Sequence, residues 1–91
     1  MSKMLTVVLD SVGNIDVGQD PFQPLFGVPR KKIQVKTLEE ASDECKKYRD
    51  EYQLGGNNWA GGQVFDCLGK QIAYVSYNGR VWSPDQEEEL I

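Results

Sequence analysis

The sequence predicts an α+β fold, with one α-helix packed on an antiparallel sheet of about four strands in a single domain of 91 residues. Apolar residues recur at helical spacing in one segment only, 37–54. Short β-branched runs, separated by Asp-x-x-Gly and Asn-Gly turns, lie on both sides of that segment. A chain this short has apolar residues for little more than one helix layer on one sheet layer.

The first strand is predicted at 5–9 (LTVVL), a short apolar run rich in β-branched residues. The next segment, 10–14 (DSVGN), has aspartate first and glycine fourth, which is typical of a type I turn closed by a glycine at positive φ. A brief second strand is expected at 15–17. The segment 20–29 (DPFQPLFGVP) contains three prolines, so it is predicted to be an ordered loop that holds its aromatic side chains against the edge of the core.

Residues 33–35 predict a short edge strand, and 37–54 the only helix. Thr37 and Glu40 form a capping box at its start. Apolar residues at steps of three and four predict its buried face: Leu38, Ala41, Cys45, Tyr48 and Tyr52. The two glycines after the helix supply the left-handed residue at which helices commonly end.

The segment 59–82 predicts a three-stranded meander with strands at 63–65, 71–77 and 80–82. Its first turn, 66–70, repeats the Asp-x-x-Gly pattern. Its second turn contains Asn-Gly, which favours a two-residue type I′ turn.

That two-residue turn would set Tyr77 opposite Arg80 and Val75 opposite Trp82, all on one sheet face. Both sheet faces are then half apolar, so we expect the Pro-rich loop or a partner to cover the face without the helix. Residues 83–91 are predicted to form a frayed acidic tail.

Composition excludes several classes of function. The net charge of −4 disfavours nucleic-acid binding by a broad basic surface. The chain has no histidine, which removes the commonest general base and most zinc sites, and two cysteines cannot form a zinc ligand set alone. No apolar run reaches the ~20 residues of a membrane span. We therefore expect a cytoplasmic protein with reduced thiols and no membrane partner.

No catalytic, cofactor-binding or metal-binding residue is predicted. The glycine-rich segment 55–62 (GGNNWAGG) lacks the Lys-Ser/Thr ending of a P-loop. The acidic residues at 10–20 do not follow the spacing of a calcium loop. Cys45 lies on the apolar helix face, and Cys67 lies in a turn without a histidine to activate it. The sequence therefore predicts that the protein is not an enzyme.

Aromatic and basic residues are the candidates for partner contact, because Tyr, Trp and Arg are enriched at binding hot spots. The candidates are Tyr77, Arg80, Trp82, Trp59, Arg30, Lys31 and Lys32. Two alternatives stay open. Trp82 can belong to the core with Arg80 at its edge, and the basic triplet can be a solvated loop.

The segment WAGGQVFDCLGKQIAYVSYNGRVW resembles a family of small uncharacterised proteins of bacteria, phages and prophages. These pair a LEEA helix start with a G-x-V-x-D-x-x-G-x-x-x-A-x-x-S-Y-N-G-R-x-W ending. The likeness includes 10–14 and 20–21, so it spans most of the chain. The segment 36–82 is more weakly similar to small phage anti-CRISPR inhibitors, in which one helix precedes a terminal hairpin ending in Gly-Lys/Arg-x-Trp. Neither resemblance assigns residue roles.

The sequence therefore predicts a small non-enzymatic protein-interaction module, such as a phage-type inhibitor that occludes the surface of a protein or ribonucleoprotein. One alternative is single-stranded nucleic-acid binding through the aromatic strand residues, Arg80 and the basic triplet. Another is a homodimer or larger homo-oligomer formed through an uncovered sheet face or edge.

Overall fold

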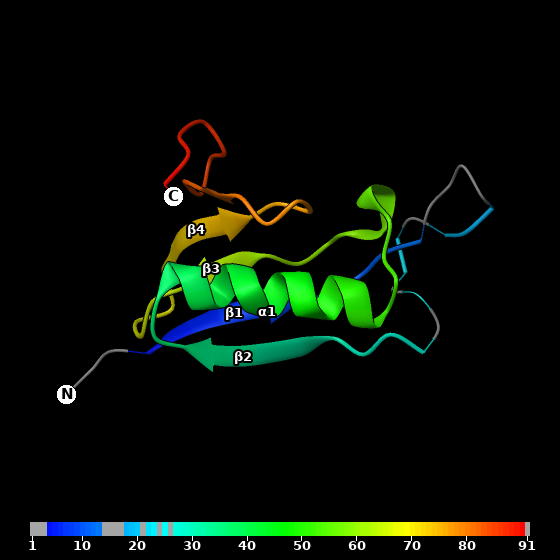
Figure 1. Cartoon of the computed structure of the whole chain (residues 1–91), viewed down its shortest axis with the longest axis horizontal. Helices are drawn as coiled ribbons and strands as arrows, with labels where there is room; N and C mark the ends of the chain where they lie inside the picture. The colour runs from blue at the N-terminus through cyan, green and yellow to red at the C-terminus, as the bar shows by residue number, and fades with distance from the viewer. Residues whose placement is uncertain (1–3, 14–17, 21, 24, 26, 91) are drawn as a thin grey trace.

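The computed structural model describes residues 4–13, 18–20, 22–23, 25 and 27–90. It confirms the α+β class: one α-helix packs on an antiparallel sheet (Figure 1). The sheet has five strands where the sequence predicts about four. The second strand expected at 15–17 lies outside the described residues.

The strand order in the sheet is β2-β1-β3-β4-β5, and every neighbouring pair is antiparallel. The elements in chain order are β1 (Leu5–Leu9), β2 (Lys31–Val35), α1 (Leu38–Glu51), the short 3-10 helix η2 (Gly56–Asn58), β3 (Gln63–Phe65), β4 (Gln71–Val75) and β5 (Val81–Trp82). β1 therefore lies between the predicted edge strand and the C-terminal meander, and joins them into one sheet.

The α-helix begins as the sequence predicts. The Thr37 hydroxyl accepts a hydrogen bond from the Glu40 backbone N–H at 3.1 Å, and the Glu40 carboxylate accepts one from the Lys36 N–H at 3.1 Å. Its end differs from the prediction, because the left-handed residue is Gln53 (φ 52°) and not a glycine. The Leu54 N–H then donates to the Arg49 carbonyl at 2.9 Å, so the helix is closed one turn before the glycines.

The core lies between α1 and one face of the sheet. Val7 pairs with Val64, and Val64 pairs with Ala73, so a fully buried row crosses three strands. From the helix, Ala41, Cys45 and Tyr48 are buried against this row, as the apolar stripe predicts. The remaining buried apolar residues of the core are Leu9, Val35, Leu54, Val75 and Val81. The sheet face that bears this row is therefore the one that the helix covers.

The β4–β5 turn is attached to α1 by side chains of the helix. The Ser42 hydroxyl donates to the Gly79 carbonyl at 2.6 Å, and Arg49 Nη1 donates to the Tyr77 carbonyl at 2.7 Å. The Arg49 guanidinium also lies 5.3 Å from the centre of the Tyr77 ring. These contacts hold the β4–β5 turn against the helix, and the helical residues that make them lie beside the apolar stripe.

The type I′ turn predicted at Asn-Gly is wrong. The Gly79 N–H donates to the Ser76 carbonyl, the Ser76 N–H donates to the Arg80 carbonyl, and Gly79 alone has positive φ (88°). This is a type I turn followed by a glycine bulge, one residue longer than the predicted turn. The register therefore shifts, so that Val75 faces Val81 and Tyr74 faces Trp82.

The two Asp-x-x-Gly segments fold differently. At 66–70 the prediction is confirmed, because the Gly69 N–H donates to the Asp66 carbonyl at 3.0 Å and Gly69 has φ 85°. At 10–14 it is wrong, because Gly13 does not have positive φ and donates to the Gln23 carbonyl at 3.0 Å. There the chain continues in extended form, and Ser11 forms a bridge with Trp59. Tertiary pairing overrides the local turn preference.

The Pro-rich loop packs aliphatic side chains against the edge of the core. Of its two phenylalanines, Phe26 lies outside the described residues and Phe22 does not pack against the core. Leu25 and Val28 pack against the core. The Leu25 N–H donates to the buried Ser11 hydroxyl at 3.1 Å. Phe22 is 88% exposed, contrary to the expectation that the loop's aromatics pack against the core.

The acidic tail is not frayed over its described part, 83–90. The Leu90 N–H donates to the Val81 carbonyl and the Ser83 N–H to the Glu88 carbonyl, both at 2.7 Å, and Glu89 forms a bridge with Trp82. Ser-Pro-Asp makes the reversal, because the Gln86 N–H donates to the Ser83 carbonyl and the Ser83 hydroxyl donates to Asp85. The tail therefore covers the outer edge of β5.

Candidate partner-binding surface

Only one long edge of the sheet is free among the described residues. β5 has β4 on one side and the folded-back tail on the other. β2 pairs with β1 alone, and it lies at the border of the sheet with no described element beyond it (Figure 1). A five-residue edge strand is long enough to accept a further strand through its outward backbone groups.

The face of the sheet opposite α1, called the open face below, carries the residues that alternate with the buried row. On β1, β2 and β3 they are Thr6, the buried Val8, Lys32, Gln34, Gln63 and Phe65, and the face continues over Tyr74 of β4 and Trp82 of β5. Pairing sets Gln34, Thr6 and Phe65 side by side across three strands, and Lys32 opposite Val8. Lys32 and Gln34 are exposed. This polar row, with one aromatic ring, continues directly into the free edge of β2.

Two hollows lie on the open face and share Lys32 and Phe65. The larger, about 590 Å³, is lined at its ends by Met4 and by residues of the β3–β4 turn. The smaller, about 230 Å³, reaches Asp10, Arg30 and Ala60. Together they extend along most of the β1–β2 pair, which suits an extended ligand better than a compact one.

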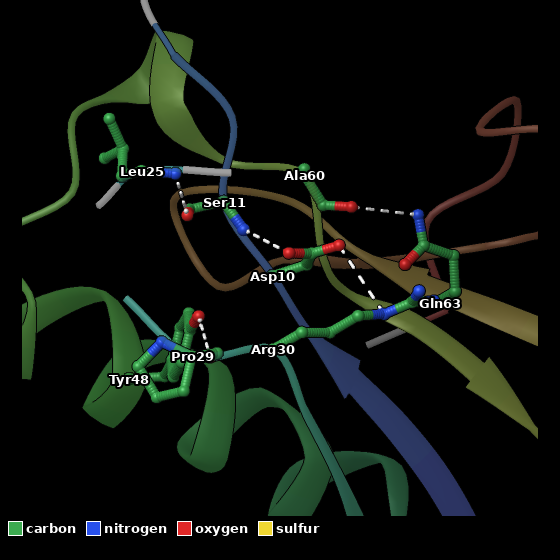
Figure 2. Close-up of polar contacts among 8 residues, drawn as sticks. All are labelled: Asp10, Ser11, Leu25, Pro29, Arg30, Tyr48, Ala60 and Gln63. Atoms are coloured by element: carbon green, nitrogen blue, oxygen red, sulfur yellow. Dashed lines mark hydrogen bonds and ion pairs between the residues drawn. The ribbon is translucent and has the colours of Figure 1, made fainter. Parts of the chain in front are cut away.

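Arg30, Asp10 and Gln63 all line the smaller hollow, and Figure 2 shows the Arg30 side chain directed toward Asp10 and Gln63. Arg30 Nε lies 3.6 Å from Asp10 Oδ2, and Gln63 Nε2 donates to the Ala60 carbonyl at 3.3 Å. The pair is partly solvated, since the Arg30 side chain is 61% exposed, so it contributes little to stability. Arg30 is therefore held over the open face with part of its charge available to a ligand.

The basic triplet is divided between the two sheet faces. Arg30 and Lys32 line the open face, whereas Lys31 Nζ lies 5.7 Å from the centre of the Tyr52 ring on the helix side. Lys32 forms no ion pair within the described part of the chain. The triplet was expected in a loop, but Lys31 and Lys32 belong to β2, whose alternation separates them.

Tyr77, Arg80 and Trp82 do lie together, although the register that predicted it is wrong. They line a hollow of about 410 Å³ with Gln86 of the tail. The arginine that stacks on Tyr77 is Arg49 and not Arg80. The tail borders this hollow, since Gln86 lines it and Glu89 forms a bridge with Trp82, and Arg80 is the only charged residue in its described lining.

Trp59 has a structural role. Its indole Nε1 donates to the Val75 carbonyl at 3.0 Å, and its ring meets the Tyr48 ring edge-on with centroids 6.3 Å apart. Tyr48 in turn donates its hydroxyl to the Pro29 carbonyl at 2.7 Å (Figure 2). Burial, with a contribution from Asp10, raises the pKa of Tyr48 to about 12, which keeps it a neutral donor. These contacts join α1 to both ends of the sheet.

The two thiols differ in accessibility, and this gives a first prediction. Both are free, Cys45 buried and Cys67 exposed. Burial first, and then Glu44, raises the pKa of Cys45 to about 12, so its thiolate is scarce near the ordinary thiol pKa of about 8.5. We expect a disulfide reagent to modify Cys67 alone in the native protein and both thiols after unfolding. A Cys67→Ser variant that still reacts rapidly when native would contradict this.

Several residues of the open face were missed by sequence reasoning. Thr6, Gln34, Gln63 and Phe65 come from three strands, and only the pairing of β1 with both β2 and β3 brings them together. A signal was present at 32–35, where the polar Lys32 and Gln34 alternate with the apolar Ile33 and Val35. Their neighbours on other strands could not be identified without the strand order.

Among the described residues, no group of three His, Cys, Asp or Glu side chains could hold a metal ion. In the part of the chain that the structure describes, no helix is both long enough and apolar enough to cross a bilayer. Comparisons with protein-family models, with curated proteins and with solved structures find no match for this chain.

Proposed function

We propose that this chain is a non-enzymatic protein-interaction module that binds its partner along the free edge of β2 and the adjoining open face. The observation that carries the proposal is that no described segment of the chain lies on the outer side of β2, while the tail covers the opposite edge of the sheet. Strand edges are recurrent sites of peptide recognition, because the backbone supplies affinity and alternate side chains supply specificity.

The hollow around Tyr77, Arg80 and Trp82 supports the proposal less well. Arg49 already occupies the Tyr77 carbonyl and ring, and the tail occupies one side of Trp82. A partner there would have to accommodate the tail, which lies beside β5. The phage-type inhibitor function and the cytoplasmic location stay predictions of the sequence.

Affinity capture with matched charge-reversal variants tests the proposal. The immobilised protein is exposed to a nuclease-treated lysate of cells that express it naturally, so that capture through nucleic acid is removed. We expect wild type to retain a discrete protein and Lys32→Glu to lose it. Lys47→Glu makes the same charge change on the exposed side of α1 and should retain it. Equal retention by both variants, or retention only without nuclease, would overturn the proposal.

A further inference from the structure

The search for an occupant of the β2 edge begins with the charges around it. Lys32 and Lys36 are exposed cations without an ion-pair partner in the described residues, and Arg30 is balanced only in part by Asp10. A second copy added in antiparallel fashion through β2 would bring two such groups of cations together, which is unfavourable. The charge of the edge therefore selects against self-pairing and for an acidic segment.

The two faces of β2 differ in what they offer. On the open face the strand presents Lys32 and Gln34, with Arg30 beside them. On the helix side it presents the half-buried Ile33 and the buried Val35, which pack against the core, and at its start Lys31, whose ammonium lies over the Tyr52 ring. Since successive side chains of an added strand point to opposite faces, its residues would meet cations and an apolar surface in turn.

Resting on the proposed function, we propose that the partner segment is an extended strand that alternates acidic and apolar residues and adds to β2 as the sixth strand of the sheet. Its acidic side chains lie over Lys32 and Arg30 on the open face. Its apolar side chains extend the contact of Ile33 on the helix side. Backbone hydrogen bonds to the outer edge of β2 hold it in register.

A nucleic-acid strand fits the same surface less well. Phe65 is the single aromatic side chain that lines the two hollows, so successive bases lack a stacking platform. The alternation of β2 also turns Lys31 to the other face, so a phosphate backbone that follows the open face meets fewer cations than the basic triplet contains.

Fluorescence anisotropy with labelled probes tests the inference. The probes are a peptide of about eight residues that alternates Glu and Val, a peptide of the same composition in Glu-Glu-Val-Val blocks, an alternating Lys-Val peptide, and an oligothymidylate. We expect the alternating Glu-Val peptide to bind most tightly. Its affinity should fall when ionic strength rises from about 0.1 M to about 1 M, because the Debye length shortens from about 10 Å to about 3 Å.

Lys32→Glu should weaken binding of the alternating Glu-Val peptide by roughly five-fold or more, and Lys47→Glu by less than about two-fold, in line with exposed ion pairs. Equal binding of the block or Lys-Val peptide, or an unchanged affinity in Lys32→Glu, would overturn the acidic-strand inference. Preferred binding of the oligothymidylate would replace it by nucleic-acid recognition. If no peptide binds but the lysate protein is still lost in Lys32→Glu, the inference fails while the proposed function stands.

Discussion

Replacing Gly62 by alanine is expected to lower the free energy of unfolding by at least about 3 kcal/mol. Gly62 has φ 100°, which non-glycine residues rarely adopt. A Cβ at this position would also run into the Val75 carbonyl. The backbone cannot move away easily, because the Gly62 N–H donates to the Val8 carbonyl at 2.7 Å and its carbonyl accepts from the Val75 N–H at 2.8 Å.

Gly62 thus extends β3 between β1 and β4, where strain would spread to both neighbouring strands. A domain of this size has a total stability of about 5–13 kcal/mol, so the substitution removes a large share of it. Urea unfolding followed by circular dichroism measures the change. Gly69→Ala is the matched control: φ is also positive, at 85°, but nothing lies within 4 Å of the added Cβ.

The control variant should lose only about 1 kcal/mol, the cost of the backbone conformation without a steric clash. If Gly62→Ala and Gly69→Ala lower the free energy of unfolding by equal amounts, the close approach of Gly62 to Val75 does not contribute to the effect. The comparison also explains why the segment GGNNWAGG is rich in glycine. Gly61 and Gly62 lie where strand backbones approach closely, so a side chain at either position would clash with the backbone of a neighbouring strand.

Local chemistry predicts the parts of this fold in which only near neighbours matter. The Thr37 N-cap, the apolar stripe of α1 and the strand at Leu5–Leu9 depend on short-range preferences, and the structure confirms them. The capping box is confirmed only in part, because the Glu40 carboxylate accepts from the Lys36 N–H and not from that of Thr37. The turn at 66–70 belongs to this group, because the Asp66 side chain accepts from the Leu68 and Lys70 N–H groups at 2.9 Å. These hydrogen bonds also lower the pKa of Asp66, and the bond from the Lys70 N–H has the largest effect.

The failures occur where tertiary contacts compete with local preference. Asn-Gly favours a two-residue turn, but Ser42 and Arg49 bind the carbonyls of the longer turn from outside the hairpin. Gly13 is drawn into pairing with Gln23, and the acidic tail is fixed by β5. The open face could not be predicted for the same reason, because β1 pairs with strands far apart in the chain. Shifting the hairpin by one residue moved Trp82 from the face of Val75 to that of Tyr74.

Substitutions of Trp59 test whether this residue stabilises the fold or contacts a partner, as the sequence suggested. Because its half-buried ring packs against the core and meets Tyr48, Trp59→Ala is expected to lower the free energy of unfolding by roughly 2–4 kcal/mol. Trp59→Phe keeps an aromatic ring but loses the hydrogen bond to the Val75 carbonyl, which costs about 1 kcal/mol. Thermal and urea unfolding measure both changes.

Binding by Trp59→Phe then decides between the two roles. This variant stays folded, so a purely structural Trp59 leaves capture of the lysate protein and affinity for the alternating Glu-Val peptide within about two-fold of wild type. A loss of binding with little loss of stability would instead make Trp59 part of the contact surface. The expected result is the first one, because the indole N–H is already engaged with Val75 and the ring does not line the hollows of the open face.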